Sequence, residues 1–241
     1  MTAPEATVER ALVVVAHPDD VDFGAAGTIA TWTDAGIEVS YCLCTDGDAG
    51  GFDPAVPRDQ IAGIRQAEQR AAAKEVGVED VVFLGYPDGR LTAGVELRRD
   101  ITRVIRSRRP DRMLISSPER NWDRIRSSHP DHLAAGEAAI SAVYPDARNP
   151  FAHLELAAEG LEAWTVGEVW VMAGAAADVN RYVDVTEVFD RKLAALRAHV
   201  SQTAHMDDLE GMLRGWQGLA AAAAGFEQGR LAEAFRVVNT R

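Results

Sequence analysis

The chain has 241 residues, which is enough to bury a sizeable core as one domain spanning 1–241. Its formal net charge of −12 argues against a nucleic-acid partner. No run of about 18 apolar residues occurs, so no membrane span is expected. The residues from Met1 to Glu5 lack the basic and apolar regions of a signal peptide, so we expect a cytoplasmic protein.

Apolar runs alternate with helix-like runs through the first two thirds of the chain. The pattern predicts strands at 11–16, 38–44, 80–84 and 112–116, and helices at 24–35, 58–76, 94–109 and 132–143. Gly36 and Gly77 stand where the first two helices should end, as helix-terminating glycines commonly do. The alternation predicts an α/β fold, with a Rossmann-like, mostly parallel sheet flanked by helices. No G-x-G-x-x-G follows the first strand, so a dinucleotide cofactor is not implied.

The pattern changes after the helix at 132–143. The segment from Tyr144 to Trp164 is loop-like. Strands are predicted at 169–172 and 181–185, and helices at about 187–200 and 206–224, which would form a small C-terminal helical extension. The arginine-rich segment 98–112 is interpreted as a solvated helix face, with an anion site as the alternative.

Two short clusters of histidine and aspartate follow predicted strands. A-H-P-D-D occupies 16–20, directly after the first strand, and H-P-D-H occupies 129–132, after the fourth strand and a loop. Strand-to-helix loops of a parallel sheet meet at the carboxyl ends of the strands, so we expect the two clusters to converge on one site. Two imidazoles and one carboxylate suffice for an open metal site that keeps a position for water.

With these two clusters in this order, the chain resembles the PIG-L/LmbE-like family of metal-dependent N-acetylglucosaminyl de-N-acetylases. The resemblance extends from Leu12 to about Gln202. It implies a hydrolase that removes an N-acetyl group from an amino sugar, with a metal ion at the site.

The resemblance also implies roles for the residues of both clusters. The metal ligands would be His17, Asp20 and His132. Asp19 would be the general base, and His129 would stabilise the oxyanion or protonate the leaving nitrogen. Asp131 would hold the His129 imidazole in orientation and raise its basicity. From the residues alone, either histidine of the second cluster can complete the triad, and Asp19 or Asp20 can instead cap the next helix.

Zinc is the metal expected for hydrolysis at such a site. Two histidines and one carboxylate also describe non-haem iron sites, so Fe²⁺ or another divalent metal remains an alternative. The additional acid Asp19 beside the ligands favours water activation over oxygen chemistry.

Four further residues are candidates for substrate contacts: Asp48, Arg65, Asp88 and His199. Asp48 stands where relatives often have glutamate. Arg65 begins an R-x-x-E match, with an i,i+3 surface pair as the alternative. Asp88 lies in G-Y-P-D-G, which is also an ordinary turn sequence. His199 begins an H-x-S-Q-like element and can instead complement a helix C-terminus.

We therefore predict a zinc-dependent hydrolase that removes an N-acetyl or other N-acyl group from an amino-sugar-containing small molecule, releasing acetate and a free amine. One alternative is an amidase acting on thiol-cofactor conjugates. The other is a non-catalytic carbohydrate- or metal-binding module. Because relatives often form trimers or hexamers, a homo-oligomer is a further expectation, although no interface can be identified in the sequence.

Overall fold

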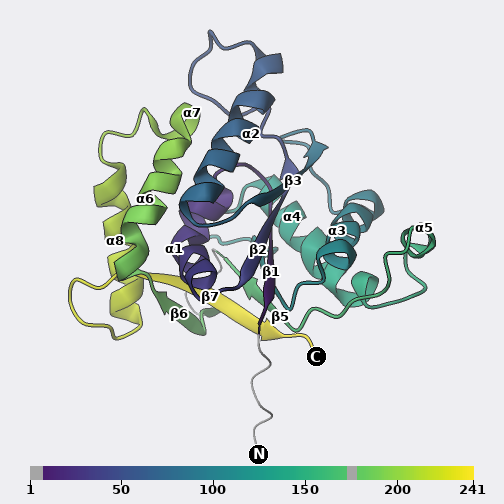
Figure 1. The fold of residues 1–241 in the computed structure, drawn as a ribbon. Coiled ribbons are helices and arrows are strands. Elements are labelled where there is room, and N and C mark those ends of the chain that lie inside the picture. Colours follow the sequence, from purple (N-terminus) through teal and green to yellow (C-terminus); the bar gives the residue numbers. More distant parts are fainter. Residues whose placement is uncertain (1–7, 173–177) are drawn as a thin grey trace, which may run out of the picture.

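Seven strands form one mixed sheet in the computed structural model, which describes residues 8–172 and 178–241 (Figure 1). They are β1 (Arg10–Val15), β2 (Glu38–Thr45), β3 (Asp80–Tyr86), β4 (Arg112–Ile115), β5 (Glu168–Val171), β6 (Arg181–Asp184) and β7 (Ala232–Asn239). The order is β3-β2-β1-β4-β5-β7-β6, and the first five strands of this order pair in parallel. The predicted Rossmann-like, mostly parallel sheet is confirmed.

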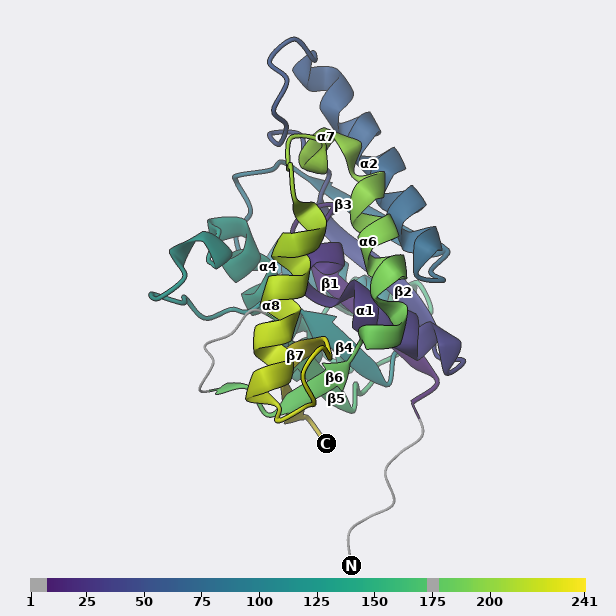
Figure 2. The ribbon, with the colours of Figure 1, turned by 90° about the vertical axis from the view of Figure 1, so that its left-hand side faces the viewer.

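Helices cover both faces of the sheet (Figure 1). On one face lie α1 (Asp20–Asp34), α2 (Arg58–Glu75) and α6 (Phe189–Ala198), and on the other lie α3 (Val95–Arg108) and α4 (Pro130–Ser141). The short α7 (Val200–Thr203) continues from α6, and α8 (Leu209–Ala223) lies beside α6 in Figure 2. No helix among the described residues is long and apolar enough to cross a membrane.

The central strand β1 shows why the sheet needs cover on both faces. Ala11, Val13 and Val15 pack into the core with α1 and α2, while Leu12 and Val14 pack into the core with α3 and α4. Because successive side chains point to opposite faces, a strand buried on both faces is apolar without alternation. The strand ends at Val15, and the polar cluster that follows is placed at the edge of the sheet.

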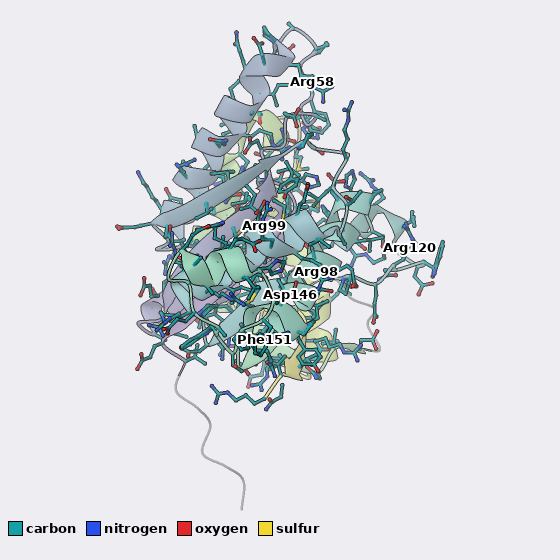
Figure 3. All side chains as sticks on the ribbon, turned by 90° about the vertical axis from the view of Figure 1, so that its right-hand side faces the viewer. Arg58, Arg98, Arg99, Arg120, Asp146 and Phe151 are labelled. Atoms are coloured by element: carbon teal, nitrogen blue, oxygen red, sulfur yellow. The ribbon has the colours of Figure 1, made fainter. Side chains whose placement is uncertain are left out.

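The segment after α4 is more structured than the sequence predicts. It contains an irregular helical segment (Ala142–Ala147) and α5 (Leu154–Ala158). Arg106 of α3, which is only 2 % exposed, donates to backbone carbonyls of this segment. Arg98 donates two hydrogen bonds to the Asp146 carboxylate, and the two residues lie side by side in Figure 3. The interpretation of 98–112 as a solvated face is therefore wrong for Arg106, because its charge is covered by carbonyl oxygens.

The strand β7 is the main element that the sequence analysis does not predict. The expected helical extension is present as α6 to α8, but the chain then returns to the sheet between β5 and β6, antiparallel to both. Glu233 of β7 accepts hydrogen bonds from the N–H groups of Gly27 and Thr28 in α1. The buried Lys192 Nζ lies 2.6 Å from Glu233 Oε1 and donates to the Phe23 carbonyl. This pair ties β7 to the helix that follows the first cluster.

The residues that carry the expectation about a signal peptide, Met1 to Glu5, lie outside the described part of the chain.

Candidate active site

The two clusters come together at the carboxyl edge of the parallel strands, where the loops after β1 and β4 are neighbours. His17 Nδ1 lies 3.2 Å from His132 Nε2. The Asp20 carboxylate contacts both rings, with 2.9 Å from Oδ1 to His132 Nε2 and 3.5 Å from Oδ2 to His17 Nδ1. Side chains of His17 and Asp20, three positions apart, thus meet that of His132, which lies more than 110 positions later in the sequence.

These separations fit a divalent metal. Ligand atoms about 2.0–2.1 Å from a tetrahedral zinc ion are about 3.3 Å from one another. The ring nitrogens of His17, His129 and His132 also lie within 4.8 Å of one another. Asp20 contacts His17 and His132 more closely than that, so His17, Asp20 and His132 form the tighter set.

The second ring nitrogen of His17 is held by carboxylates. His17 Nε2 lies 3.3 Å from Asp131 Oδ2 and 3.1 Å from Asp88 Oδ1. Burial lowers the pKa of His17, but Asp20, Asp131 and Asp88 outweigh it and raise that pKa to about 12. The carboxylates therefore favour positive charge at this point, which a metal cation would supply in place of the proton. A carboxylate on the far nitrogen of a ligating histidine is the usual arrangement around metals.

The prediction that Asp131 orients His129 through its carboxylate is wrong. That carboxylate accepts hydrogen bonds from the backbone N–H groups of Gly89 (2.7 Å) and Leu91 (3.2 Å), in addition to its contact with His17. Asp131 is almost fully buried by these contacts. It therefore joins the loop after β3 to the ring of His17.

His129 is oriented by the backbone instead. The N–H of Asp131 donates to His129 Nδ1 over 3.2 Å, so His129 caps the start of α4. Because Nδ1 accepts, the proton of the neutral ring is on Nε2. Burial, His17 and His132 all lower the pKa of His129, which also favours the neutral ring. His129 lies close to the metal-binding set, with its ring centroid 5.0 Å from that of His17.

Asp19 lies beside this set in an unusual backbone conformation. Its φ of 89° and ψ of −24° are in the left-handed region, which is costly for a residue with a Cβ. Its backbone N–H donates to Gln69 Oε1 over 2.8 Å, and Arg65 Nη2 donates to its Oδ2 over 3.0 Å. Burial raises the pKa of Asp19 to about 6, against the opposing effect of Arg65. Such a carboxylate is ionised near neutral pH and able to accept a proton.

Arg65 holds the loops of the site and is not open to solvent as a substrate anchor. Only 4 % of it is exposed. Beyond Asp19, it donates to the carbonyls of Pro18 (2.6 Å) and Gly47 (3.3 Å). A Cβ on Gly47 would lie 2.5 Å from Arg65 Nη1, so the loop needs glycine there. The surface-pair alternative is wrong, because Glu68 accepts hydrogen bonds from Ser201 instead.

The other candidate substrate contacts have mixed outcomes. Asp48 Oδ1 accepts the backbone N–H of Asp88 over 2.8 Å, so Asp48 supports the loop that carries Asp88. Asp88 lies at the site, with Oδ2 3.9 Å from Arg65 Nη1. His199 is fully buried and its Nε2 lies 2.8 Å from Asp22 Oδ2. Direct contact of His199 with a substrate is therefore contradicted. His199 does lie at the C-terminal end of α6, as the alternative has it, but its side chain contacts Asp22.

Sequence reasoning missed two residues beside Asp19, namely Asp22 and Gln69. Gln69 lies one turn after Arg65 on α2, and residues four apart share a helix face. That spacing is the signal that would have pointed to it. Asp22 lies within the first turn of α1, where an acidic residue is ordinary, so the sequence carries no special signal for it.

The chain is similar to known proteins over most of its length. The PIG-L family model, described as GlcNAc-PI de-N-acetylase, matches residues 12–143. The chain is 35 % identical over 195 residues to a diacetylchitobiose deacetylase of Thermococcus kodakarensis, covering 81 % of this chain and 70 % of that protein. It is 36 % identical over 202 residues to a probable N-acetyl-α-D-glucosaminyl L-malate deacetylase 2 of Bacillus cereus, covering 81 % of this chain and 84 % of the relative.

A solved structure shares the fold. The N,N′-diacetylchitobiose deacetylase of Pyrococcus horikoshii, complexed with its inhibitor MPG, matches with a TM-score of 0.87 and 29 % identity. The match covers 96 % of this chain and 84 % of that chain. It therefore includes the C-terminal part that lies beyond the family model.

Proposed function

Since the chain belongs to the PIG-L family, we propose that it hydrolyses the N-acetyl amide of a small molecule containing N-acetylglucosamine, releasing acetate and a free amine. The observation that carries this proposal is the convergence of His17, Asp20 and His132 with Asp19 beside them. The named relatives act on diacetylchitobiose and on N-acetylglucosaminyl malate, so a glucosamine derivative is the proposed substrate class.

Zinc is the metal we propose, with Fe²⁺ as the alternative for the same ligands. His17 Nδ1, the Asp20 carboxylate and His132 Nε2 would hold it. When bound there, the metal supplies a Lewis acid that polarises the acyl carbonyl and lowers the pKa of the attacking water.

Asp19 is the proposed general base. It takes a proton from the attacking water on its carboxylate, while Arg65 holds Oδ2 and keeps the group pointed at the site. A carboxylate with a pKa of about 6 can then return this proton to the leaving nitrogen. One residue thereby serves as base in the first half of the reaction and as acid in the second.

His129 is proposed to stabilise the oxyanion as a neutral ring. Its Nδ1 already accepts the Asp131 N–H, so Nε2–H is the group left to donate to the acyl oxygen as negative charge develops. Of the two roles that the resemblance implies for His129, this geometry favours oxyanion stabilisation over proton transfer to the amine.

The test is release of acetate and free amine by the zinc-loaded protein from a panel of substrates. The panel contains N-acetylglucosamine, N,N′-diacetylchitobiose, N-acetylglucosaminyl malate and N-acylated thiol-cofactor conjugates. Hydrolysis of the acetylated sugars supports the proposal, and preference for the thiol conjugates favours the amidase alternative. If no member is hydrolysed while zinc is bound, the proposal fails and the non-catalytic alternative gains support.

The ligand set has a separate test in metal content. His132→Ala should lose most of the bound zinc, whereas His129→Ala should keep it. The reverse result would make His129 the ligand. A cytoplasmic location, a homo-oligomeric state and a single domain over 1–241 stay predictions.

A further inference from the structure

A chain of buried hydrogen bonds leads from Asp19 to the H-V-S-Q element at 199–202. The Asp19 N–H donates to Gln69 Oε1, and Gln69 Nε2 donates to Asp22 Oδ2, each over 2.8 Å. His199 Nε2 lies 2.8 Å from the same Asp22 oxygen. Gln69, Asp22 and His199 are all fully buried. These hydrogen bonds link α1 and α2 to His199, which lies between α6 and α7 and stands 180 positions after Asp19.

In this series of hydrogen bonds, the chemistry of each partner determines which atom donates and which accepts. Asp22 is an acceptor, so the Gln69 amide must turn its nitrogen toward Asp22 and its oxygen toward the Asp19 N–H. His199 Nε2 supplies the second donor to Asp22 Oδ2. Within the described residues, Asp22 Oδ1 and His199 Nδ1 have no hydrogen-bond partner. The Asp22 carboxylate thus depends on His199 and Gln69 for its side-chain donors.

The residue at the end of this series of hydrogen bonds, Asp19, has a strained backbone conformation. A non-glycine residue in the left-handed region is strained and persists only where its surroundings hold it. Gln69 holds the N–H of Asp19, and Arg65 holds its carboxylate. Without the Gln69 acceptor, the Asp19 N–H would have no such partner and the backbone would be free to leave φ 89°.

The same element meets α2 at a second point that does not lead to Asp19. Ser201 donates from its N–H (2.7 Å) and from its Oγ (2.6 Å) to Glu68, the residue before Gln69. Figure 2 shows α7 and the end of α6 beside α2. The Glu68–Ser201 contact therefore offers a control that perturbs the same helices without touching the chain to the proposed base.

We propose that His199 is a positioning residue for the general base, acting through Asp22 and Gln69 to hold Asp19 in its left-handed conformation. This inference rests on the proposed function, because it gives Asp19 the role of base. It assigns a positioning role to His199, which lies outside the residues matched by the family model, 12–143.

A double-mutant cycle tests the proposal on the zinc-loaded protein. His199→Phe keeps a ring of similar size but removes both nitrogens. It should lower kcat by roughly tenfold to hundredfold, as loss of supporting hydrogen bonds around a site does, with KM and zinc content unchanged. In the Asp19→Ala background the same change should have no further effect on kcat. His199→Gln retains an N–H donor and should restore most of the activity.

Ser201→Ala is the matched control and should remain within about twofold of wild type, because Asp19 keeps its chain to Gln69. The proposal is overturned if His199→Phe lowers kcat equally in the wild-type and Asp19→Ala backgrounds, or if Ser201→Ala lowers it as much. Such results would show a general effect on the packing of α7. If His199→Phe does not fold, the same double-mutant cycle with Asp19→Ala can be measured with Gln69→Met.

A crystal structure of Gln69→Met separates this inference from the proposed function. We expect Asp19 to leave the left-handed region in that variant, whatever substrate the protein uses. If Asp19 keeps its φ near 89°, the positioning role is wrong even for an active deacetylase. If wild-type protein hydrolyses no panel member, the proposed function fails, while the backbone of Asp19 still decides whether Gln69 and His199 position it.

Discussion

Two arginines on opposite faces of the sheet are buried to nearly the same degree, with 4 % of Arg65 and 2 % of Arg106 exposed. Arg106 on α3 donates only to backbone carbonyls, which belong to Asp146, Ala147, Asn149, Ala152 and Leu161. Arg65 on α2 donates to two carbonyls and to the Asp19 carboxylate, and its Nη1 lies 3.9 Å from Asp88.

The acceptors, and not the burial, distinguish the two roles. The guanidinium of Arg106 donates to carbonyl oxygens spread over residues 146–161 and so holds this segment against α3. Arg65 has a charge that acts on groups able to gain or lose protons. Within the described residues, its Nε has no partner, whereas Arg106 uses Nε and both terminal nitrogens. Of these two buried arginines, the one with a carboxylate among its partners is the one that lies at the candidate site.

The largest effect should follow from removing the carboxylate that Arg65 faces. Asp19→Asn should lower kcat by roughly a hundredfold to ten-thousandfold, because the amide cannot accept the proton of water. Zinc content and melting temperature should stay near those of wild type. Steady-state kinetics on the best panel substrate measures this, and turnover within a few-fold of wild type would remove Asp19 from the role of base.

Arg106→Met should instead affect stability and leave the chemistry intact. The change leaves several carbonyls without their donor, and we expect a loss of about 3 kcal/mol in the free energy of unfolding. Urea denaturation measures this loss, and kcat of the folded fraction should be unchanged. A variant that keeps full stability but loses turnover would reverse the distinction between the two arginines.

Arg65→Met should lower kcat/KM by roughly tenfold to hundredfold with a smaller loss of stability. It should also change the pH profile. Arg65 lowers the pKa of Asp19, so its removal raises that pKa. Because the base must be ionised, the acidic limb of the kcat/KM profile should move to higher pH. An acidic limb that stays in place would show that Arg65 does not act on the base. Arg106→Met, which has no carboxylate partner, is the control and should leave the limb unmoved.

The smallest effect should come from the residue that makes room for Arg65. Gly47 has a φ of +65°, and an added Cβ would press on the guanidinium. Gly47→Ala should cost about 1 kcal/mol of stability and reduce kcat by a few-fold. Gly36→Ala is the matched control, since Gly36 also has a positive φ but a Cβ there would meet no atom within 4 Å. Equal losses of activity in the two variants would contradict the close-approach argument.

The sequence predicted most of the parallel sheet because its signals are local. Apolar runs mark β1 to β4, and Gly36 and Gly77 mark the ends of the first two helices. The position and direction of β7 in the sheet could not be predicted from local patterns. Its residues, Ala232–Asn239, form a strand by pairing with β5 and β6, which lie far from it in sequence.

The candidate site shows the same division between local and distant information. The positions of His17 and His132 at one edge follow from strand ends. The partner of Asp131 does not, because its carboxylate reaches across to His17 while only its backbone contacts His129. The burial of His199 against Asp22 depends on how α7 returns to α2, which no local pattern specifies.

The carboxylate of Glu233 has a consequence for how this protein is made. It binds the backbone of α1 at Gly27 and Thr28, more than 200 positions earlier in the chain. While the protein is being synthesised, the ribosome delivers the first cluster long before it delivers this partner. The hydrogen bonds from α1 to Glu233 can therefore form only after residue 233 has emerged. The strands β1 to β4 all precede residue 116, whereas the contact that joins α1 to β7 must wait for the last strand.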